Sequence, residues 1–358
     1  MAFSLSAAFK ALVIALGLSI TDIGVHGALR TSLSSHRSLA PRRDLGLHNI
    51  LDKIPKPPPP PPPPQNERSL TTATDGSKIL NGVVDIEGLL IRYKVSAPVA
   101  LFMTGTRIPG AAGIRGVSSD LGLNVLIHGD GGEGFDDFPN QGVRENLAGI
   151  ALQAPNQELN WGGGSGNNRP DGVQHSEAIR EFIFMFLPEI LSFDSDNVFF
   201  TGISGGAMLL TGYFIPTFMH ELPNTGALLL CGAMPPQVPW VKAKKFIGNT
   251  RFHFQSTKNE LDGLGDLIIE TIDAFSETAT KMRVSDNRLD KLQTVNNDPK
   301  GGHCIFDDVD FYSSIKLMAE SYPNIMQKGG DGIVPGIGNV LDGTTTTILS
   351  FDKAVQAK

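Results

Sequence analysis

The chain has 358 residues, of which 41% are hydrophobic and 19% are charged. This length and composition indicate an ordinary globular protein, with one large domain or two small ones and ample apolar side chains for a core. The formal net charge of −7 and the lack of any Lys/Arg-rich run argue against nucleic acid or an anionic membrane as the partner.

Residues 1–27 have the pattern of a secretory signal peptide. Lys10 precedes a short apolar run, and Val25-His26-Gly27 offers small residues at the positions that a signal peptidase reads. The run is too short for a stable bilayer anchor, although an uncleaved N-terminal anchor is the alternative. We therefore expect a secreted, extracellular protein with no integral membrane segment once the signal is removed.

A polar segment and a stiff spacer separate this signal from the first expected strand. The pair Arg42-Arg43 is either a pro-peptide cleavage site or a chance pair. Residues 57–64 are an unbroken proline run, which adopts polyproline II and spans roughly 25 Å at ~3.1 Å per residue. We expect a disordered pro-segment and linker over 28–68, a folded domain over 69–327 and a Gly/Thr-rich tail over 328–358.

From residue 82 onward, segments typical of strands alternate with segments typical of helices. The expected strands cover 83–95 (as one or two strands), 124–127, 148–154, 198–201, 227–231, 252–256 and 289–295. The expected helices cover 173–187, a run from 207, 264–282 and 309–321. This alternation predicts an α/β fold with a mostly parallel central sheet and helices on both faces. In such sheets, functional sites lie at the carboxyl ends of the strands.

The run Gly202-Ile203-Ser204-Gly205-Gly206 is a G-x-S-x-G motif between an apolar strand and a helical run. A nucleophile elbow requires this context, because a sharp strand-to-helix turn exposes the serine hydroxyl at the edge of the sheet. Its glycines leave room for the backbone to approach neighbouring chain. An ordinary Gly-rich turn with a solvated serine is the alternative, but the flanking strand and helix favour Ser204 as a nucleophile.

His303 is the expected base for this serine. A serine nucleophile needs a base to take its proton, and in this kind of fold the partners follow in the order Ser, acid, His. His303 comes after the last expected strand, in a loop whose glycines let the backbone approach the site. We expect the competitors His220 and His253 to be structural, and His128 is a weaker rival.

The acid that orients the imidazole is expected in the loop after strand 252–256, where Glu260 and Asp262 are the candidates. Either carboxylate could instead cap the following helix. The glutamate side chain reaches further, and Asp262 is better placed to cap the helix. We therefore favour Glu260 and keep Asp262 as the alternative.

The run His128-Gly129-Asp130-Gly131-Gly132, here called the HGDGG loop, follows a short buried strand. We expect the N–H groups of Gly129, Asp130 and Gly131, together with that of Gly205, to act as an oxyanion hole. Such donors stabilise the negatively charged oxygen of a tetrahedral intermediate.

Trp161 and two cysteines complete the expected site. The glycine-rich run 161–173 is expected on the substrate side with Trp161 as an apolar wall, and a plain surface loop is the alternative. Cys231 and Cys304 follow expected strands at the same sheet edge, so they form either a disulfide that holds the His303 loop or two unpaired buried thiols. The sequence has no metal-ligand spacing, Walker motif or dinucleotide-binding glycine pattern, so we expect no metal and no organic cofactor.

The motifs HGDGG, W-G-x-G followed by D-x-V, TGISGGAM and GGHC occur in this order. Together they resemble the α/β-hydrolase superfamily, and within it the secreted esterases of the polyhydroxybutyrate depolymerase and feruloyl esterase-like branch. The stretch 82–321 is also similar to a family of fungal secreted proteins of this fold. The resemblance implies Ser204 as nucleophile, His303 as base, and the Asp130 and Gly205 N–H groups as oxyanion donors. The sequence departs from the family at the acid, where Asn259-Glu260 replaces the expected aspartate.

These inferences predict a monomeric serine hydrolase that cleaves carboxylic esters through a Ser-His-acid triad and an acyl-enzyme. A serine peptidase or amidase with the same triad is the closest alternative among enzymes. The alternative from another class is a hydrolase-like protein that binds a partner or ligand and has lost catalysis. The presence of both Ser204 and His303 in the expected order argues against that last alternative.

Overall fold

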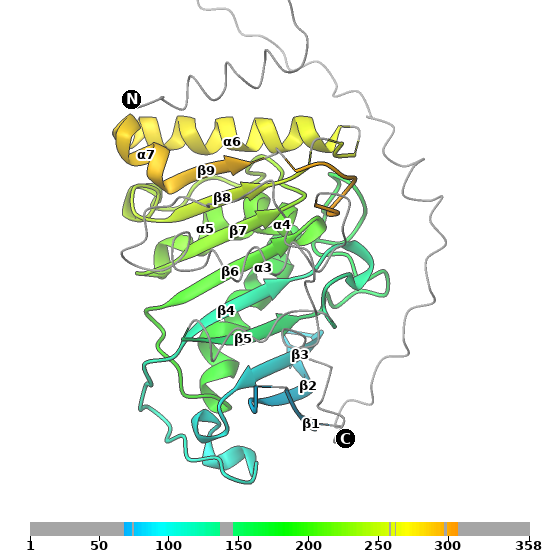
Figure 1. Ribbon diagram of the computed structural model, residues 1–358, viewed down its shortest axis with the longest axis vertical. Coiled ribbons are helices and arrows are strands. Elements are labelled where there is room, and N and C mark those ends of the chain that lie inside the picture. The colour runs from blue at the N-terminus through cyan, green and yellow to red at the C-terminus, as the bar shows by residue number, and fades with distance from the viewer. Residues whose placement is uncertain are drawn as a thin grey trace, which may run out of the picture.

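The computed structural model of the protein describes residues 68–73, 75–136, 146–257, 259–261, 263–296 and 299–306. Within these ranges one nine-stranded sheet runs through the molecule, with the strand order β1-β2-β3-β5-β4-β6-β7-β8-β9 (Figure 1). The strands are β1 (Ser69–Thr72), β2 (Lys78–Ile86), β3 (Leu89–Ala97), β4 (Gly122–Ile127), β5 (Leu147–Leu152), β6 (Val198–Ile203), β7 (Gly226–Leu230), β8 (Arg251–Gln255) and β9 (Gln293–Asn296).

Most of this sheet is parallel. The strands from β5 through β4, β6, β7 and β8 to β9 pair in parallel with their neighbours. β1, β2 and β3 form an antiparallel ribbon that joins the sheet at β5. The parallel strands bring their carboxyl ends to one edge, where loops from different strands meet. The predicted α/β fold with a mostly parallel sheet is confirmed, and the segment 83–95 contributes to two strands.

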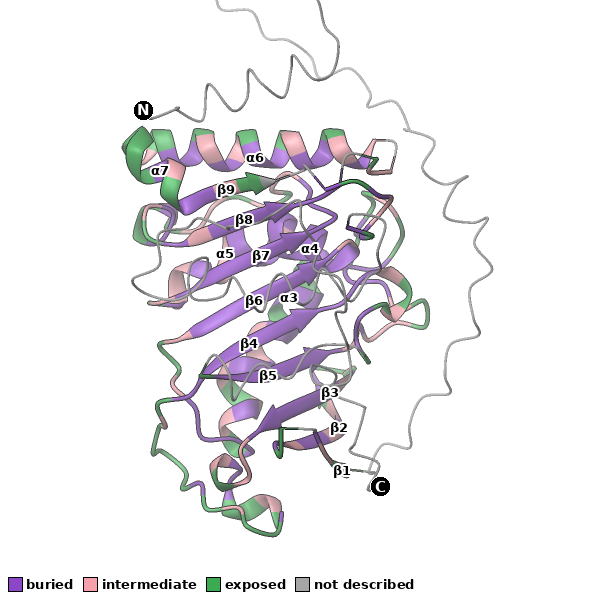
Figure 2. Ribbon diagram, in the orientation of Figure 1, coloured by how far each residue is buried: buried purple, intermediate pink, exposed green. Residues whose placement is uncertain are grey.

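Both faces of the central strands are buried. On β4, Leu123, Val125 and Ile127 join the larger core cluster, whereas Leu126 joins a second cluster on the opposite face. This alternation follows from the period of two along a strand. Because neither face meets solvent, the strands appear in the sequence as continuous apolar runs (Figure 2).

The helices are α3 (Gly172–Glu181), α4 (Gly205–Leu209), α5 (Ile215–Phe218), α6 (Leu264–Lys281) and α7 (Asp286–Leu292). α3 continues into a π turn at Phe182–Phe186 and a 3-10 turn at Leu187–Glu189, which contains Pro188. A π turn at Leu210–Phe214 joins α4 to α5. α6 packs its apolar side on the larger cluster and turns its polar side outward (Figure 2).

The expected strand 289–295 is only partly correct. Its first half is the end of α7, and β9 begins at Gln293. Ser285 stands at the N-cap position of this helix, a position that serine favours. Leu289 and Leu292, three residues apart, are both buried, as two residues on one side of a helical turn can be. The apolar spacing in this short segment therefore fits a helix as well as a strand.

Several expectations concern residues outside the described ranges. They are the signal peptide over 1–27, the pro-segment with its proline run, the helix over 309–321, and the tail with its boundary at 327. The first described strand begins at Ser69. In the described part of the chain, no helix is long and apolar enough to cross a bilayer.

Candidate active site

β6 leads directly into the turn that carries Ser204. The strand ends at Ile203, α4 starts at Gly205, and Ser204 between them has φ 47° and ψ −113°. A left-handed φ is unfavourable for a residue with a Cβ, so the surrounding structure imposes it. The Ser204 N–H donates to Leu230 O at 2.8 Å, and the Met208 N–H donates to Ser204 O at 3.0 Å. The turn is therefore fixed between β7 and α4.

Two glycines allow this turn its tight shape. A Cβ on Gly202 would lie 2.7 Å from Ala207 Cα, and a Cβ on Gly206 would collide with the carbonyl oxygen of Ile127 at the end of β4. The elbow therefore packs α4 against β6 and β4 at a distance that only glycine permits.

His303 lies beside Ser204. Its Nε2 is 2.9 Å from Ser204 Oγ, and its Nδ1 is 2.5 Å from Glu260 Oε1. Because a carboxylate only accepts hydrogen bonds, Nδ1 carries the hydrogen and Nε2 accepts from the serine hydroxyl. The Glu260 side chain is 6% exposed and that of His303 is 21% exposed, so the imidazole keeps one open side.

Of the two expected acids, Glu260 contacts the imidazole and Asp262 lies outside the described residues. Glu260 Oε1 also accepts a hydrogen bond from the Leu261 N–H at 3.0 Å. Glu260 Oε2 is buried and has no hydrogen-bond partner among the described residues. One oxygen thus makes both contacts, which fixes the orientation of the carboxylate toward His303.

Two contacts hold the loop that carries His303. Cys304 forms a disulfide with Cys231 at the end of β7, with the Cα atoms 5.3 Å apart. The Thr257 Oγ1 donates to Gly302 O at 3.0 Å and so connects the loop after β8 to the same segment. Of the two alternatives for the cysteines, the structure has the disulfide.

The HGDGG loop follows β4, and two of its three expected donors are already engaged. The Gly129 N–H donates to Glu133 O at 2.8 Å. The Gly131 N–H donates to Leu159 O at 3.1 Å and to Asn160 Oδ1 at 3.0 Å. These bonds fold the loop and anchor it, so the expectation that Gly129 and Gly131 act as oxyanion donors is wrong.

The N–H groups of Asp130 and Gly205 remain. Among the described residues, neither of them has a hydrogen-bond acceptor. The peptides that carry them follow Gly129 and Ser204, which lie side by side, because a Cβ built on Gly129 would be 3.5 Å from Ser204 Cβ. Two donors without an acceptor among the described residues therefore lie beside the serine.

Arg169, which the sequence analysis did not single out, forms a forked ion pair with Asp130. Its Nη1 and Nη2 each lie 2.7 Å from one carboxylate oxygen, and the Arg169 side chain is 1% exposed. The carboxylate lies against Gly205, since a Cβ on that glycine would collide with it. One signal could have identified this residue, because Arg169 is the single cation of the glycine-rich run 161–173.

Trp161 does not form a wall of the substrate side, because it is fully buried. Its ring centroid lies 5.5 Å from that of His128 and 5.9 Å from that of His175 on α3. Gly162 and Gly163 have left-handed φ values of 81° and 67°, which turn the chain sharply after the tryptophan. The glycine-rich run thus folds over a buried aromatic ring.

His128 and His175 are structural histidines in this arrangement. The His128 Nε2 accepts from the Ala154 N–H at 2.9 Å, so Nδ1 carries the hydrogen and donates to Gly129 O at 2.6 Å. The His175 Nδ1 accepts from the Gly162 N–H at 2.8 Å. Burial lowers the pKa of each imidazole to about 4. Both rings are therefore neutral at physiological pH.

The other two competing histidines also make local contacts. The His253 Nδ1 lies 2.8 Å from Thr294 Oγ1, and its Nε2 lies 3.1 Å from Gln255 Oε1. Burial lowers the pKa of His253 to about 4. The His220 Nδ1 lies 3.0 Å from Thr217 O, one turn earlier in the chain. Neither imidazole contacts Ser204, in agreement with the expectation that they are structural.

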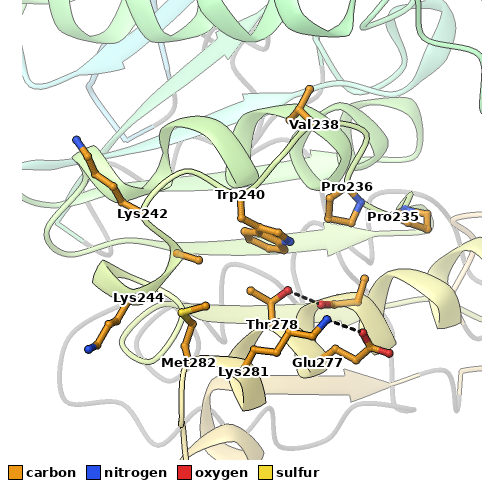
Figure 3. Close-up of a pocket in the computed structure, with 12 residues that line it drawn as sticks. Pro235, Pro236, Val238, Trp240, Lys242, Lys244, Glu277, Thr278, Lys281 and Met282 are labelled. Carbon is orange, nitrogen blue, oxygen red and sulfur yellow. Dashed lines mark hydrogen bonds and ion pairs between the residues drawn. The ribbon is translucent and has the colours of Figure 1, made fainter. Parts of the chain in front are cut away.

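A groove of about 620 Å³ lies elsewhere, between α6 and the segment 235–244 (Figure 3). Trp240, Pro235 and Pro236 are among its apolar lining residues, and Lys242 and Lys244 also line it. None of the three hydrogen-bonded site residues lines this groove. In the part of the chain that the structure describes, no three His, Cys, Asp or Glu side chains gather as a metal site requires.

The strand order, the elbow after β6 and the loops at the carboxyl ends of the parallel strands define the α/β-hydrolase fold. No protein-family model matches the chain, and no curated protein matches it.

Three solved structures illustrate what the chain is similar to. With a thermostable esterase it shares 15% identity over 64% of this chain and 61% of that chain, at a TM-score of 0.43. With a ferulic acid esterase the identity is 12% over 74% of this chain and 99% of that chain, at a TM-score of 0.41. With an acylaminoacyl peptidase from Pyrococcus horikoshii the identity is 10% over 77% of this chain and 50% of that chain, at a TM-score of 0.42. The chain thus spans less than two thirds of the first and third of these proteins.

Proposed function

We propose that this chain is a secreted serine hydrolase that cleaves carboxylic esters. The observation that carries the proposal is the hydrogen-bonded series from Ser204 Oγ through His303 to Glu260, with separations of 2.9 and 2.5 Å. Nucleophilic catalysis by serine requires a nucleophile, a base and an orienting carboxylate in this order.

In the proposed reaction, Ser204 Oγ attacks the ester carbonyl carbon while its proton passes to His303 Nε2. The carbonyl oxygen takes up the electron pair and accepts hydrogen bonds from the Asp130 and Gly205 N–H groups. When the bond to the leaving alkoxide breaks, Nε2 returns the proton to that oxygen. Water, deprotonated by the same imidazole, then hydrolyses the acyl-enzyme and frees the serine. Glu260 stabilises the imidazolium and keeps the hydrogen on Nδ1.

Location and substrate class are further parts of the proposal. The pattern over residues 1–27 supports secretion, and the Cys231–Cys304 disulfide is typical of an oxidising compartment. The order of motifs supports an enzyme of the polyhydroxybutyrate depolymerase and feruloyl esterase-like branch. We propose a monomer that needs no metal or organic cofactor.

The test compares the wild type with Ser204→Ala, using a fluorophosphonate probe and short p-nitrophenyl esters. We expect the wild type to be labelled and to hydrolyse the esters, and Ser204→Ala to do neither while melting at the same temperature. Ser276→Ala on α6 is the matched control, because the Ser276 hydroxyl donates to Gln293 Oε1 and to none of the three hydrogen-bonded site residues, and it should retain both properties.

Three results would contradict the proposal in different ways. Full activity of Ser204→Ala would remove the nucleophile. Turnover of p-nitroanilides but not of esters with the same acyl group would favour the peptidase or amidase alternative. A wild type that takes no label and hydrolyses neither would favour a binding protein.

A further inference from the structure

The Arg169–Asp130 ion pair lies directly behind the two N–H groups of the proposed oxyanion hole. Asp130 supplies one of these N–H groups from its own backbone. Its carboxylate contacts Gly205, which supplies the other. One residue therefore joins both donors, and Arg169 holds that residue through two charged hydrogen bonds of 2.7 Å.

A carboxylate in this position is unfavourable for ester hydrolysis by itself. Negative charge develops on the substrate oxygen next to the Asp130 and Gly205 N–H groups, and a bare carboxylate on one of these two residues would repel it. The repulsion is strong where water is scarce, and the Asp130 side chain is only 24% exposed. A cation on the carboxylate cancels most of this repulsion.

Arg169 is itself held rigidly enough to act as that cation. Its Nε donates to Gly166 O at 2.9 Å, and its Nη1 also donates to Trp161 O at 3.0 Å. The Tyr213 hydroxyl donates to the Arg169 carbonyl at 2.8 Å. The planar guanidinium thus fixes the glycine-rich run and the carboxylate with one set of donors.

A second contact from the same region supports the role. Asn160 accepts the Gly131 N–H through its side-chain oxygen at 3.0 Å, and its side-chain nitrogen donates to Gly164 O at 2.7 Å. The segment 160–169 therefore contacts the HGDGG loop at two adjacent residues, through the Asp130 carboxylate and the Gly131 N–H.

We propose, on the basis of the esterase function proposed above, that Arg169 is a positioning residue of the oxyanion hole. It fixes the Asp130 N–H in place and neutralises the Asp130 carboxylate, so that the transition-state oxyanion meets two donors and no net negative charge.

The experiment measures kcat and KM on p-nitrophenyl butyrate for Arg169→Gln, Arg169→Lys and the double variant Asp130→Asn/Arg169→Gln. Loss of one oxyanion donor typically lowers kcat by about 10²–10³-fold, so we expect about a 10²-fold loss for Arg169→Gln with KM nearly unchanged. The double variant has no carboxylate to neutralise and should recover about tenfold of that loss. Arg169→Lys keeps the charge but not the fork, and should lie between Arg169→Gln and the wild type.

Two additional measurements separate positioning from a merely structural role. A trifluoromethyl ketone, whose adduct with serine carries an oxyanion, should bind more weakly to each variant in parallel with its loss of kcat. Arg180→Lys is the matched control, because Arg180 pairs with Glu221 and Glu181 at the end of α3 and should retain full kcat.

Each outcome bears on the proposal. Wild-type kcat in Arg169→Lys and Arg169→Gln would overturn it, and so would a double variant no faster than Arg169→Gln. If Arg169→Gln does not fold, Arg169→Lys decides alone, and an unchanged kcat and ketone affinity would overturn the proposal. A wild type that hydrolyses no ester and takes no fluorophosphonate label would overturn the esterase function and this inference with it. Labelled, active wild type with unaffected variants would overturn the inference only.

Discussion

The loop that carries His303 and the loop that carries Asp130 reach the same serine from two strands, but different chemistry holds each of them. The His303 loop is attached to the end of β7 by the Cys231–Cys304 disulfide. The HGDGG loop is attached by the charged fork from Arg169 and by Asn160. A disulfide withstands acid and salt and is broken by reductant. A hydrogen-bonded ion pair is weakened by acid and salt and is unaffected by reductant.

The position of each strand in the sheet accounts for the difference. Among the strands that the structure describes, β9, which precedes His303, is the last in the order and pairs with β8. β4, which precedes Asp130, lies between β5 and β6 and is supported on both sides. A loop at the edge of the sheet has fewer neighbours to hold it, so a covalent tie contributes most there. The proposed base and the proposed oxyanion donors are therefore held independently, and each can be disturbed without the other.

The largest effect on the base side is expected from Glu260→Gln. The amide keeps the shape of the side chain but removes the negative charge, and it can favour the wrong imidazole tautomer. We expect kcat on p-nitrophenyl esters to fall by about 10⁴-fold, with little change in melting temperature. Glu277→Gln, in an exposed pair with Lys281 on α6, is the control and should turn over normally. Normal turnover of Glu260→Gln together with an inactive Asp262→Asn would make Asp262 the acid.

The next largest effect is expected from Gly205→Ala on the oxyanion side. The new methyl group would collide with the Asp130 carboxylate and so displace Asp130 together with its backbone N–H, one of the two proposed donors. We expect kcat to fall by about 10²–10³-fold. Gly265→Ala in the first turn of α6 is the matched control, because its Cβ would meet open space. An active Gly205→Ala would show that the two donors do not depend on this contact.

A smaller effect is expected when the disulfide is removed by Cys231→Ser/Cys304→Ser. The bridge joins residues 73 apart, and removing a disulfide typically costs about 2–4 kcal/mol of unfolding free energy. A shift of His303 by about 1 Å would lower kcat by on the order of 10²-fold or less. Urea unfolding measures the change in unfolding free energy, and turnover of p-nitrophenyl esters measures the change in kcat. Wild type in reductant is measured alongside the variant. An unchanged urea midpoint and kcat would mean that Thr257 and the surrounding packing suffice to hold the loop.

The smallest effect, absent at neutral pH, is the loss of unfolding free energy in mild acid that the buried His128 and His175 are expected to cause. Burial lowers the pKa of each to about 4 in the folded protein, against about 6.5 in the unfolded chain. Between these values the unfolded state binds more protons, so stability is complete above pH 6.5 and falls as pH decreases toward 4. The slope is up to about 1.4 kcal/mol per pH unit for each residue. Urea midpoints measured across this window should fall less steeply for His175→Gln than for wild type, and equal slopes would contradict the assignment.

The parts of the site that follow from local sequence were predictable. The turn at Ser204 depends on neighbouring glycines and on a strand and a helix within a few residues, all of which are visible in one window. The pairing of Ser204 with His303 follows from chain order once the fold is a parallel sheet. Glu260 could be favoured over Asp262 by its longer side-chain reach and by the better placement of Asp262 to cap the following helix.

The parts that depend on distant contacts were not predictable. Arg169 and Asp130 lie 39 residues apart, and no periodicity links them. Trp161, in a run of glycines, has the local sequence of an exposed loop, and only the turn at Gly162 places its ring between two histidines. The hydrogen-bond partners of Gly129 and Gly131 likewise depend on how the HGDGG loop folds, which its composition does not specify.

At Ser204 the backbone conformation lowers the stability of the fold, while the side chain is required for the proposed activity. Its left-handed φ costs a residue with a Cβ on the order of 1–3 kcal/mol, and glycine would adopt it freely. Ser204→Gly should therefore fold at least as stably as the wild type while losing the hydroxyl on which the proposed chemistry depends. Directed evolution that selects for heat resistance alone would favour variants that replace Ser204 with glycine. Libraries of this protein should therefore be selected for turnover as well as for survival on heating.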